Sequence, residues 1–405
     1  MLTNFILVTL DCVRADHLGC YGYGGVETPY LDRMAASGVL FEQGVTHAPN
    51  TWVAHASLFT GCFPPVHGLR APHHSISPQV ITMAEWFASH GWATAAFPGT
   101  TLVGKAQGFQ RGFDFFDQEW EAEGFHAEQV VWRKDWKKAL WRALDWMEKA
   151  GEPFLLWIHY MDTHHLPELE LPQYYRSRFS QRWQCYDGKI SYADKACAGE
   201  LWEYLRYRGL LERTVLVVFA DHGEELHEDD RPVHDGGLGE DVVRVPLVFK
   251  LPDAMKLTGL RVKEQVGLVD IFPTCCRLAN ISVPDAIQGI ALGGPTSFHG
   301  GQVQPRELYM ENWYKGFVGL RTKEWKLIMK YQDPGKWGGD SPEMTALYHL
   351  PSDPKEQKNL AESHALVVNE LKKACHRWAF NGNIHVISQQ EHGKIQRALE
   401  SLGYM

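Results

Sequence analysis

The feature that most constrains the fold is an apolar run, residues 214–220, that ends directly in Asp221 and His222. The run, TVLVVFA, is rich in β-branched residues, which is typical of a strand buried on both faces of a parallel sheet. In open α/β sheets, ligands bind beyond the carboxyl ends of such strands. A second apolar run, residues 5–10, ends in the same way at Asp11. The two runs together predict one metal site shared by the tips of two buried strands.

Predicted strands and helices alternate through most of the chain, which favours a mostly parallel sheet with helices on both faces. The predicted strands are 5–10, 92–97, 154–160, 214–220 and 245–250. The predicted helices are 28–37, 51–60, 80–90, 130–150, 188–208 and one that starts at 269. We therefore expect an α/β catalytic domain over residues 1–285, with the metal-bearing tips at one edge of its sheet.

The composition changes between 285 and 305, where Gly, Pro, Ser and Gln are frequent, as in a linker. Beyond this segment, short runs predict antiparallel strands, followed by a helix from about 361 to 378. These elements predict a small C-terminal α+β lobe over residues 306–405. The last segment, 394–405, is amphipathic and would dock on the body or on a neighbouring subunit, which leaves a homo-oligomer open.

Composition excludes several classes of function. The 405 residues are 44% hydrophobic, enough for a large core, and the net charge of −9 gives no electrostatic case for binding nucleic acid or an anionic membrane. No window approaches 18 consecutive apolar residues, so no membrane-spanning helix is expected. Asp11 stands too near the start to follow a cleaved signal peptide, which predicts a cytoplasmic protein. The eight cysteines include no CxxC pair, and we expect reduced, mostly buried thiols.

Several segments, in chain order, resemble the motifs of the sulfatase-like branch of the alkaline phosphatase superfamily. They are LDCVRADHLGCYG (10–22), APNTWVAHASLFTG (48–61), HYMDTH (159–164), DHGE (221–224), VRVPL (243–247), VDIFPT (269–274) and LYHLPSDP (347–354). The resemblance spans most of the chain, and ordered motifs at family-like spacing are specific. It implies an alkaline phosphatase-like fold and a metal-dependent ester hydrolase.

Thr51 is the position at which this chain departs from the sulfatase pattern. In sulfatases the aligned residue is a cysteine or serine, within Cys-x-Pro-x-Arg, that is converted to formylglycine. Here the segment reads TWVAH, and oxidation of threonine would give a ketone instead of an aldehyde. A threonine alkoxide is nevertheless a competent nucleophile beside a divalent metal, and a helix N-terminus at 51 would favour bound phosphate. The resemblance to phosphodiesterase members then implies a covalent phosphothreonine, whereas the simpler interpretation of Thr51 is a helix N-cap.

The predicted metal ligands are Asp11, Thr51, Asp221, His222 and Asp162. A mixture of carboxylate and imidazole suits Mn²⁺ or Zn²⁺ better than Ca²⁺ or Mg²⁺, although the latter two stay open. Asp162 with His164 and His234 would form a second metal site, so the number of ions, one or two, is not decided by the sequence.

Other polar residues are expected near the reaction. His164 and His234 would donate to the substrate oxyanion or act as general acid, and His55, in place of the family arginine, would contact phosphate. Lys105 and His227 are weaker candidates for substrate binding. The predicted catalytic residues are thus Thr51, His164, His234 and His55. Arg14 and Asp16 are expected to be supporting residues.

The function predicted from these residues is metal-dependent hydrolysis of a phosphate diester or a phosphonate monoester. A doubly charged monoester is less suited, because Thr51 has no cluster of Arg and Lys around it in the sequence. The alternatives are phosphoryl transfer to an alcohol, sulfate-ester hydrolysis without formylglycine, and a catalytically silent member that binds a metal or anion. The expected partner is a small-molecule ester, with neither nucleic acid nor membrane.

Overall fold

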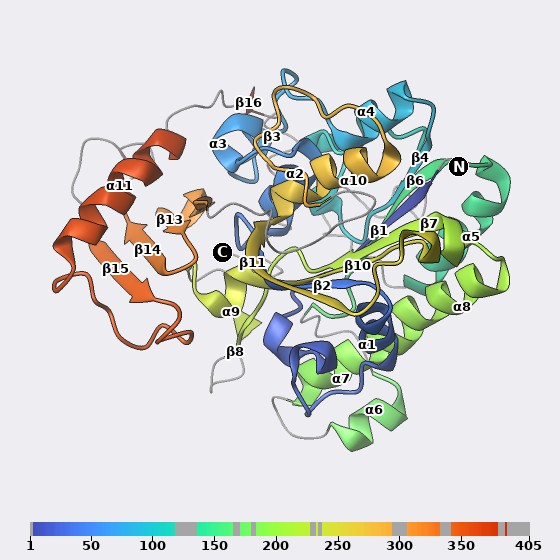
Figure 1. The fold of residues 1–405 in the computed structure, drawn as a ribbon, viewed down its shortest axis with the longest axis horizontal. Helices are drawn as coiled ribbons and strands as arrows, with labels where there is room; N and C mark the ends of the chain where they lie inside the picture. Colours follow the sequence, from blue (N-terminus) through green and yellow to red (C-terminus); the bar gives the residue numbers. More distant parts are fainter. Residues whose placement is uncertain are drawn as a thin grey trace.

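The structure is a computed structural model, and it describes residues 3–117, 136–164, 171–179, 184–226, 232–233, 237–293, 306–332, 342–379 and 385–386. An eight-stranded sheet forms the centre, in the order β11-β2-β10-β7-β1-β6-β4-β5 (Figure 1). Its strands are β1 (Asn4–Leu10), β2 (Val39–Val45), β4 (Ala93–Phe97), β5 (Phe115–Phe116), β6 (Phe154–Tyr160), β7 (Thr214–Phe219), β10 (Arg244–Lys250) and β11 (Leu260–Gly267). Two small two-stranded sheets lie outside it: β3 (His74–Ser75) with β16 (His385–Val386), and β8 (Glu225–Leu226) with β9 (Pro232–Val233).

β1 lies between β6 and β7 and runs parallel to both. Every residue of β1 is buried, as its apolar sequence predicts. Thr9 lies opposite His159 of β6 and Phe219 of β7, so the carboxyl ends of the three strands reach the same edge of the sheet. The prediction of a mostly parallel α/β sheet is confirmed. The exception is β10, which is antiparallel to both β7 and β2.

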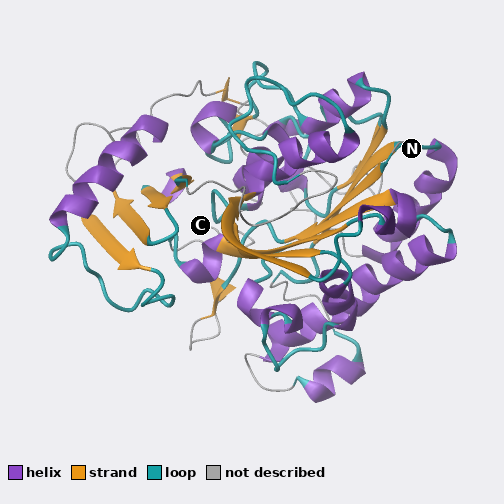
Figure 2. Cartoon of the chain, in the orientation of Figure 1, coloured by secondary structure: helices purple, strands orange, loops and turns teal. Residues whose placement is uncertain are grey.

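Helices cover both faces of the sheet (Figure 2). α2, α4 and α10 lie on one side, and α1, α7 and α8 on the other (Figure 1). The helices of the body are α1 (Pro29–Ala36), α2 (Thr51–Thr60), α3 (Pro64–His67), α4 (Met83–Ser89), α5 (Trp136–Ala150), α6 (Gln173–Arg178), α7 (Gln184–Ala193), α8 (Glu200–Tyr207), α9 (Glu240–Val243) and α10 (Ile271–Ala279). Among the helices described, none combines the length and hydropathy needed to cross a bilayer.

Besides several two-residue strands, the sequence pattern missed two long strands of the central sheet, β2 and β11, and one helix is less regular than expected. β2 carries Glu42 and Gln43, and β11 alternates apolar and charged residues, so neither forms an apolar run. Both lie on the side of the sheet beyond β10. The predicted helix 188–208 is α7 and α8 joined by a π-helical segment, η6 (Asp194–Gly199). Part of the predicted helix 130–150 lies outside the described residues.

A second, four-stranded sheet lies within the predicted C-terminal lobe (Figure 1). It is an antiparallel meander of β12 (Leu308–Asn312), β13 (Phe317–Arg321), β14 (Trp325–Lys330) and β15 (Met344–His349), with α11 (Ala365–Ala379) packed on it. Its core includes side chains of the body, among them Phe63, Leu238 and Val269. The lobe is therefore packed against the body, and a division near residue 285 stays a prediction. The amphipathic segment 394–405 lies outside the described residues.

Candidate active site and metal centre

Three parallel strands bring acidic and imidazole side chains to one buried place. Asp11 follows β1, His159 lies near the end of β6, and Asp221 comes two residues after β7. Asp11 and Asp221 are completely buried, and His159 is 3% exposed. The His159 Nε2 atom lies 3.0 Å from Oδ2 of Asp11. The shared edge of the sheet thus brings together residues that are far apart in the chain, as predicted for Asp11 and Asp221.

Asp221 and His222 hold each other in a defined orientation. Oδ1 of Asp221 accepts hydrogen bonds from the amides of His222 (3.0 Å) and Cys12 (3.3 Å). Oδ2 of Asp221 has no hydrogen-bond partner among the described residues and lies 3.6 Å from Nε2 of His222. Nδ1 of His222 lies 2.9 Å from the carbonyl oxygen of Gly223, which only accepts. Nδ1 therefore carries the hydrogen, and Nε2 presents its lone pair to the site, as in a metal-binding imidazole.

Thr51 points its hydroxyl at these residues. It is the first residue of α2, and Asn50 occupies the N-cap position without a capping side-chain bond. Thr51 Oγ1 lies 3.2 Å from Nε2 of His222 and 3.4 Å from Oδ2 of Asp11. The side chain does not act as the plain helix cap of the simpler interpretation. Because α2 begins here, its first amides and the positive end of its dipole face the same place.

His55, one helical turn after Thr51, connects the start of α2 to the sheet. Its Nδ1 lies 2.7 Å from the carbonyl oxygen of Thr51, and its Nε2 lies 3.0 Å from Oγ1 of Thr9. Thr9 Oγ1 also accepts a hydrogen bond from the Trp157 indole at 3.1 Å, so its own hydrogen is available to His55. Both ring nitrogens of His55 are thereby used inside the protein. The structure gives His55 a positioning role, and its contact with phosphate stays a prediction.

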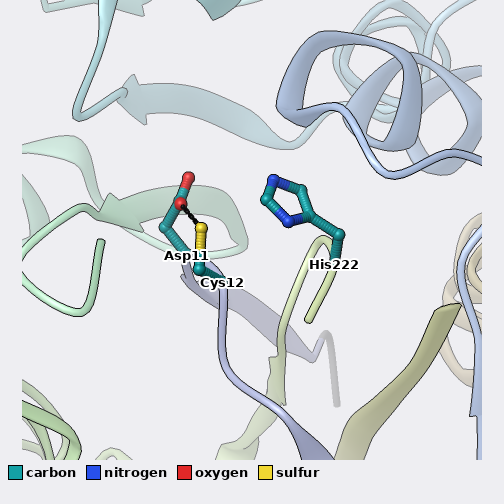
Figure 3. A group of neighbouring side chains, drawn as sticks. All are labelled: Asp11, Cys12 and His222. Carbon is teal, nitrogen blue, oxygen red and sulfur yellow. Dashed lines mark hydrogen bonds between the residues drawn. The ribbon is translucent and has the colours of Figure 1, made fainter. Parts of the chain in front are cut away.

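Cys12 contributes a sulfur atom that the sequence interpretation had counted only among the buried thiols. Its Sγ lies 2.8 Å from Oδ1 of Asp11. Figure 3 shows the two side chains together, with the His222 ring facing them across the site. One ligand atom from each of these three residues lies within 4.8 Å of the others. The available signal in the sequence was its position, directly after Asp11 at the strand tip.

His159 is the other residue of the site that sequence reasoning missed, although it opens the HYMDTH motif. Together with His55 and Asp221 it forms a second group of ligand atoms within 4.8 Å of one another. The rings of His55 and His159 lie 4.7 Å apart between centroids. This group differs from the predicted second set, Asp162, His164 and His234, and both ring nitrogens of its His55 are already hydrogen-bonded.

Burial and neighbouring charge set the protonation of this site. Burial lowers the pKa of His55 to about 3 and that of His159 to about 4, so both rings are neutral at neutral pH. Burial also opposes the charged form of His222, but the carboxylates of Asp221 and Asp11 outweigh it and raise its pKa. Burial raises the pKa of the Glu224 carboxyl to about 8. Neutral imidazoles with free lone pairs are the form in which histidine binds a metal.

The residues after β6 lie in a buried turn. Asp162 and His164 are each 1% exposed, and Nζ of Lys189 donates a hydrogen bond of 2.9 Å to the carbonyl oxygen of His164. Burial lowers the pKa of Lys189. The catalytic role predicted for His164 and the metal-binding role predicted for Asp162 stay predictions.

The weaker candidates are divided between the surface and the undescribed residues. Lys105 is exposed, in the short helix η4 (Lys105–Gln107). His227 and His234 lie outside the described residues. Arg14 pairs with Asp16 at 2.9 Å and donates from Nη1 to the carbonyl oxygen of Glu224 at 3.1 Å, so it supports the loop that follows His222.

The donor set fits a divalent cation. The carboxylates of Asp11 and Asp221 are fully buried, yet in the described part of the chain their ion-pair partners are imidazoles, with no lysine or arginine. Buried carboxylates without a positive partner are costly, and a metal ion would supply the missing charge. Oδ2 of Asp221, which lacks a hydrogen bond, and Nε2 of His222 offer lone pairs for it. The site therefore contains candidate metal ligands of mixed oxygen, nitrogen and sulfur type.

Comparisons with known proteins agree with this architecture. The sulfatase family profile matches residues 3–281, and the profile for the C-terminal region of N-sulphoglucosamine sulphohydrolase matches residues 229–379. The ulvan-active sulfatase of Formosa agariphila is 27% identical over 329 residues, which are 71% of this chain but 63% of that protein. Arylsulfatase K of Bos taurus is 23% identical over 455 residues, with 91% of this chain and 80% of that protein covered.

Two solved structures share the fold over nearly the whole chain. The phosphonate monoester hydrolase of Agrobacterium radiobacter superposes with a TM-score of 0.74 at 18% identity, covering 93% of this chain and 95% of that one. The protein BT4656, in complex with its substrate D-glucosamine-2-N,6-O-disulfate, also gives 0.74, at 19% identity, covering 93% and 97%. Since the family profile covers more than half of the chain and the sheet carries its site at the expected strand tips, this chain belongs to the sulfatase family.

Proposed function

We propose that this protein is a metal-dependent hydrolase of phosphate diesters or phosphonate monoesters, with Thr51 as its covalent nucleophile. One observation carries the proposal: the hydroxyl of Thr51 lies 3.2 Å from Nε2 of His222 and 3.4 Å from Oδ2 of Asp11, at the start of α2. A hydroxyl in contact with two candidate metal ligands, beside a helix N-terminus that favours a bound phosphate, is suited to phosphoryl transfer.

The reaction follows from these contacts. Oγ1 of Thr51 attacks phosphorus, and its proton passes to the Asp11 carboxylate, whose Oδ2 lies 3.4 Å away. The bond between phosphorus and the ester oxygen breaks, and that oxygen leaves with its electron pair. Water then attacks phosphorus, breaks the bond to Oγ1 and regenerates threonine. A divalent ion bound by this set supplies a Lewis acid that lowers the pKa of the hydroxyl and offsets charge on the phosphoryl oxygens.

The positions around Thr51 suit an ester that carries a single negative charge. Asp11 and His222 contact the hydroxyl, and the position four residues later, an arginine in the sulfatase motif, is the neutral His55. A doubly charged phosphate monoester would require more guanidinium or ammonium groups than the described part of the site supplies.

Sulfate-ester hydrolysis is the second candidate, because the curated relatives described above are sulfatases. A sulfate monoester also carries a single charge, so the charge argument does not separate it from a phosphate diester. The distinguishing feature is Thr51, whose side chain cannot become an aldehyde. A sulfatase built on this site would have to attack sulfur with the hydroxyl itself.

The test is a substrate series of matched leaving groups. Metal-loaded protein is assayed with p-nitrophenyl phenylphosphonate, bis(p-nitrophenyl) phosphate, p-nitrophenyl phosphate and p-nitrophenyl sulfate. We expect the largest kcat/KM for the first two. Thr51→Ala should lower turnover on the order of 10⁴-fold to 10⁶-fold, as loss of a nucleophile does. The matched control is Thr60→Ala, at the other end of α2, where the hydroxyl donates to the Ala56 carbonyl oxygen at 2.6 Å and accepts from the Cys62 amide at 3.3 Å.

Mass spectrometry of protein quenched during turnover should locate a phosphorus-containing adduct on the peptide that holds Thr51. The proposal fails if p-nitrophenyl sulfate is the best substrate, or if Thr51→Ala keeps full activity with a native-like melting curve. The first outcome would establish the sulfate-ester candidate, and the second would remove Thr51 from the mechanism in either case.

A further inference from the structure

Cys12 occupies a backbone position that is held from several sides. Its φ angle is 58°, in the left-handed region that residues other than glycine rarely adopt. Its amide donates to Oδ1 of Asp221 at 3.3 Å, and its carbonyl oxygen accepts from the hydroxyl of Tyr186 at 2.6 Å. Glycine would adopt this conformation without the cost, on the order of 1 kcal/mol, that a side chain brings. The turn geometry therefore does not explain why a cysteine stands here.

The side chain of Cys12 is directed at the candidate metal ligands. Its Sγ lies 2.8 Å from Oδ1 of Asp11, whereas the Sγ of Cys62 lies 3.4 and 3.6 Å from its carbonyl partners. Sulfur, carboxylate oxygen and the His222 nitrogen converge within 4.8 Å (Figure 3). The three donors come from the ends of two neighbouring strands, and all three residues are completely buried. Convergence of unlike donor atoms at a buried point is the arrangement of a metal site.

We propose that the Cys12 thiolate is a ligand of the active-site metal and makes this site selective for Zn²⁺ over Ca²⁺ and Mg²⁺. Zn²⁺ binds thiolate, imidazole and carboxylate together, commonly with three protein ligands and an open fourth position in catalytic sites. Asp11, Cys12 and His222 supply those three types of donor, and the hydroxyl of Thr51 lies next to them. Ca²⁺ and Mg²⁺ take oxygen ligands and gain little from sulfur.

This inference rests on the metal of the proposed function but not on which ester is cleaved. Asp221 assists in either case, since its Oδ1 accepts from the amides of both Cys12 and His222 and so orients two of the three donors. Removal of such an orienting group commonly lowers metal affinity about 10-fold to 100-fold. Loss of the thiolate itself should lower it by at least as much.

The experiment uses Co²⁺ as a spectroscopic substitute for Zn²⁺. Metal-free full-length protein is titrated with Co²⁺, and the near-ultraviolet region is examined for a thiolate-to-cobalt charge-transfer band. Cys12→Ser removes the sulfur, and Cys12→Asp replaces it with a carboxylate. Cys62→Ser is the matched control, because Cys62 is also buried but its thiol lies against the backbone carbonyl oxygens of Thr60 and Ala286. Zn²⁺ affinities come from competition with a chromophoric chelator.

We expect the charge-transfer band in the native protein and in Cys62→Ser, and its loss in both Cys12 variants while Co²⁺ still binds to Cys12→Asp. Zn²⁺ affinity should fall at least about 10-fold in Cys12→Ser, and Cys12→Asp should shift preference towards Mn²⁺, Mg²⁺ or Ca²⁺. Cobalt bound by native protein without a thiolate band overturns this inference and leaves the proposed function intact. If native protein binds no divalent ion, both fail.

Discussion

Two buried charged regions of this molecule differ in how their charges are balanced. At the junction of the body and the lobe, each carboxylate faces a permanently charged side chain. Arg70 binds Glu311 through two hydrogen bonds of 2.6 and 2.7 Å, and Glu240 receives Arg321 at 2.9 Å and Lys326 at 3.1 Å. All of these side chains come from the chain itself, so this region is complete as soon as the protein folds.

At the strand tips the balance is different. Asp11 and Asp221 are buried as deeply, but their described partners are the imidazoles of His55, His159 and His222. His55 and His159 are neutral, and the one imidazole whose pKa is raised, His222, does not by itself cancel two carboxylate charges. Buried charge therefore serves two purposes in this molecule. At the junction, paired charges fix the lobe against the body. At the strand tips, the negative charge is not balanced by the protein and would be neutralised by a bound cation.

Removal of the metal should have the largest effect on activity, because the ion is expected at the strand tips and not at the junction. We expect a strong chelator to lower kcat/KM on the order of 10³-fold or more, because a bound ion supplies several kcal/mol of transition-state stabilisation. Adding Zn²⁺ at 100 times its Kd should restore activity and stabilise the protein by about 2.7 kcal/mol. Activity assays and calorimetry check both. Full activity in exhaustively chelated protein would show that the strand-tip site, like the junction, does not depend on a bound cation.

Breaking the junction should affect stability and spare the metal. Arg70→Met leaves the buried Glu311 carboxylate without its positively charged partner, although the Tyr309 hydroxyl still donates to it at 2.6 Å, and should cost about 3–5 kcal/mol of unfolding free energy. The double variant with Glu311→Gln should recover part of the loss, because no unpaired charge remains. Denaturant unfolding measures the stability, and chelator competition should give an unchanged Zn²⁺ affinity. Equal losses in the single and double variants would show that charge pairing is not what stabilises the junction.

Acid should weaken the junction in a defined pH range. Burial by itself would raise the pKa of Glu240, but Lys326 and Arg321 outweigh it and hold the pKa well below its ordinary 4.5. In acid, the folded state therefore binds fewer protons than the unfolded state. The stabilisation that ionised Glu240 gives to the folded protein is fully present above about pH 4.5 and is lost as the pH falls further. Its size should be about 1.4 kcal/mol for each unit by which the pKa is lowered.

The decisive measurement is a comparison of native protein with Glu240→Gln. Glu356, whose pKa is raised by burial, contributes in the opposite direction, so the whole-protein curve alone is not sufficient. Glu240→Gln should unfold at lower denaturant concentration at neutral pH and should lose less stability between pH 4.5 and 3. If the variant loses as much stability between pH 4.5 and 3 as the native protein, Glu240 is not the source of the acid sensitivity.

The smallest expected effect is a change in the stability of the metal-free protein on Asp221→Asn, and its sign should be opposite to that of Glu240→Gln at the junction. Asp221→Asn keeps an oxygen to accept the amides of Cys12 and His222 but removes one buried negative charge. Metal-free protein should therefore become more stable by about 1 kcal/mol, while Zn²⁺ affinity falls at least about 10-fold. Glu240→Gln, the same change in the other region, should be destabilising. A destabilised metal-free Asp221→Asn protein would show that the site, like the junction, already balances its own charges.

Much of this architecture could be predicted from local sequence. β1, β6 and β7 agree with the predicted strands within one residue, because strands buried on both faces are continuous apolar runs. α2 has the predicted bounds, and it ends at Gly61, whose φ of 62° suits a helix terminus. β2 and β11 could not be predicted in this way, since polar residues interrupt their apolar pattern.

The candidate site was predictable only in part. Asp11, Thr51, Asp221 and His222 are brought together as expected, because parallel strands end at one edge of the sheet and α2 begins beside it. The antiparallel direction of β10 was not predictable, because an apolar run reads alike in both directions. Roles for His164, Asp162 and Lys105 stay predictions, and those for His227 and His234 concern residues that the structure does not describe.

By itself, the sequence determined which chemical groups stand at the ends of the buried strands and that a threonine replaces the formylglycine precursor. These are properties of single positions and of short apolar runs, which depend on local burial. The tertiary structure decided that His159 contacts Asp11, 148 positions away, and that Cys12 and His222 converge on one point. Strand register and a left-handed turn at Cys12 set those contacts, and both result from packing between distant segments.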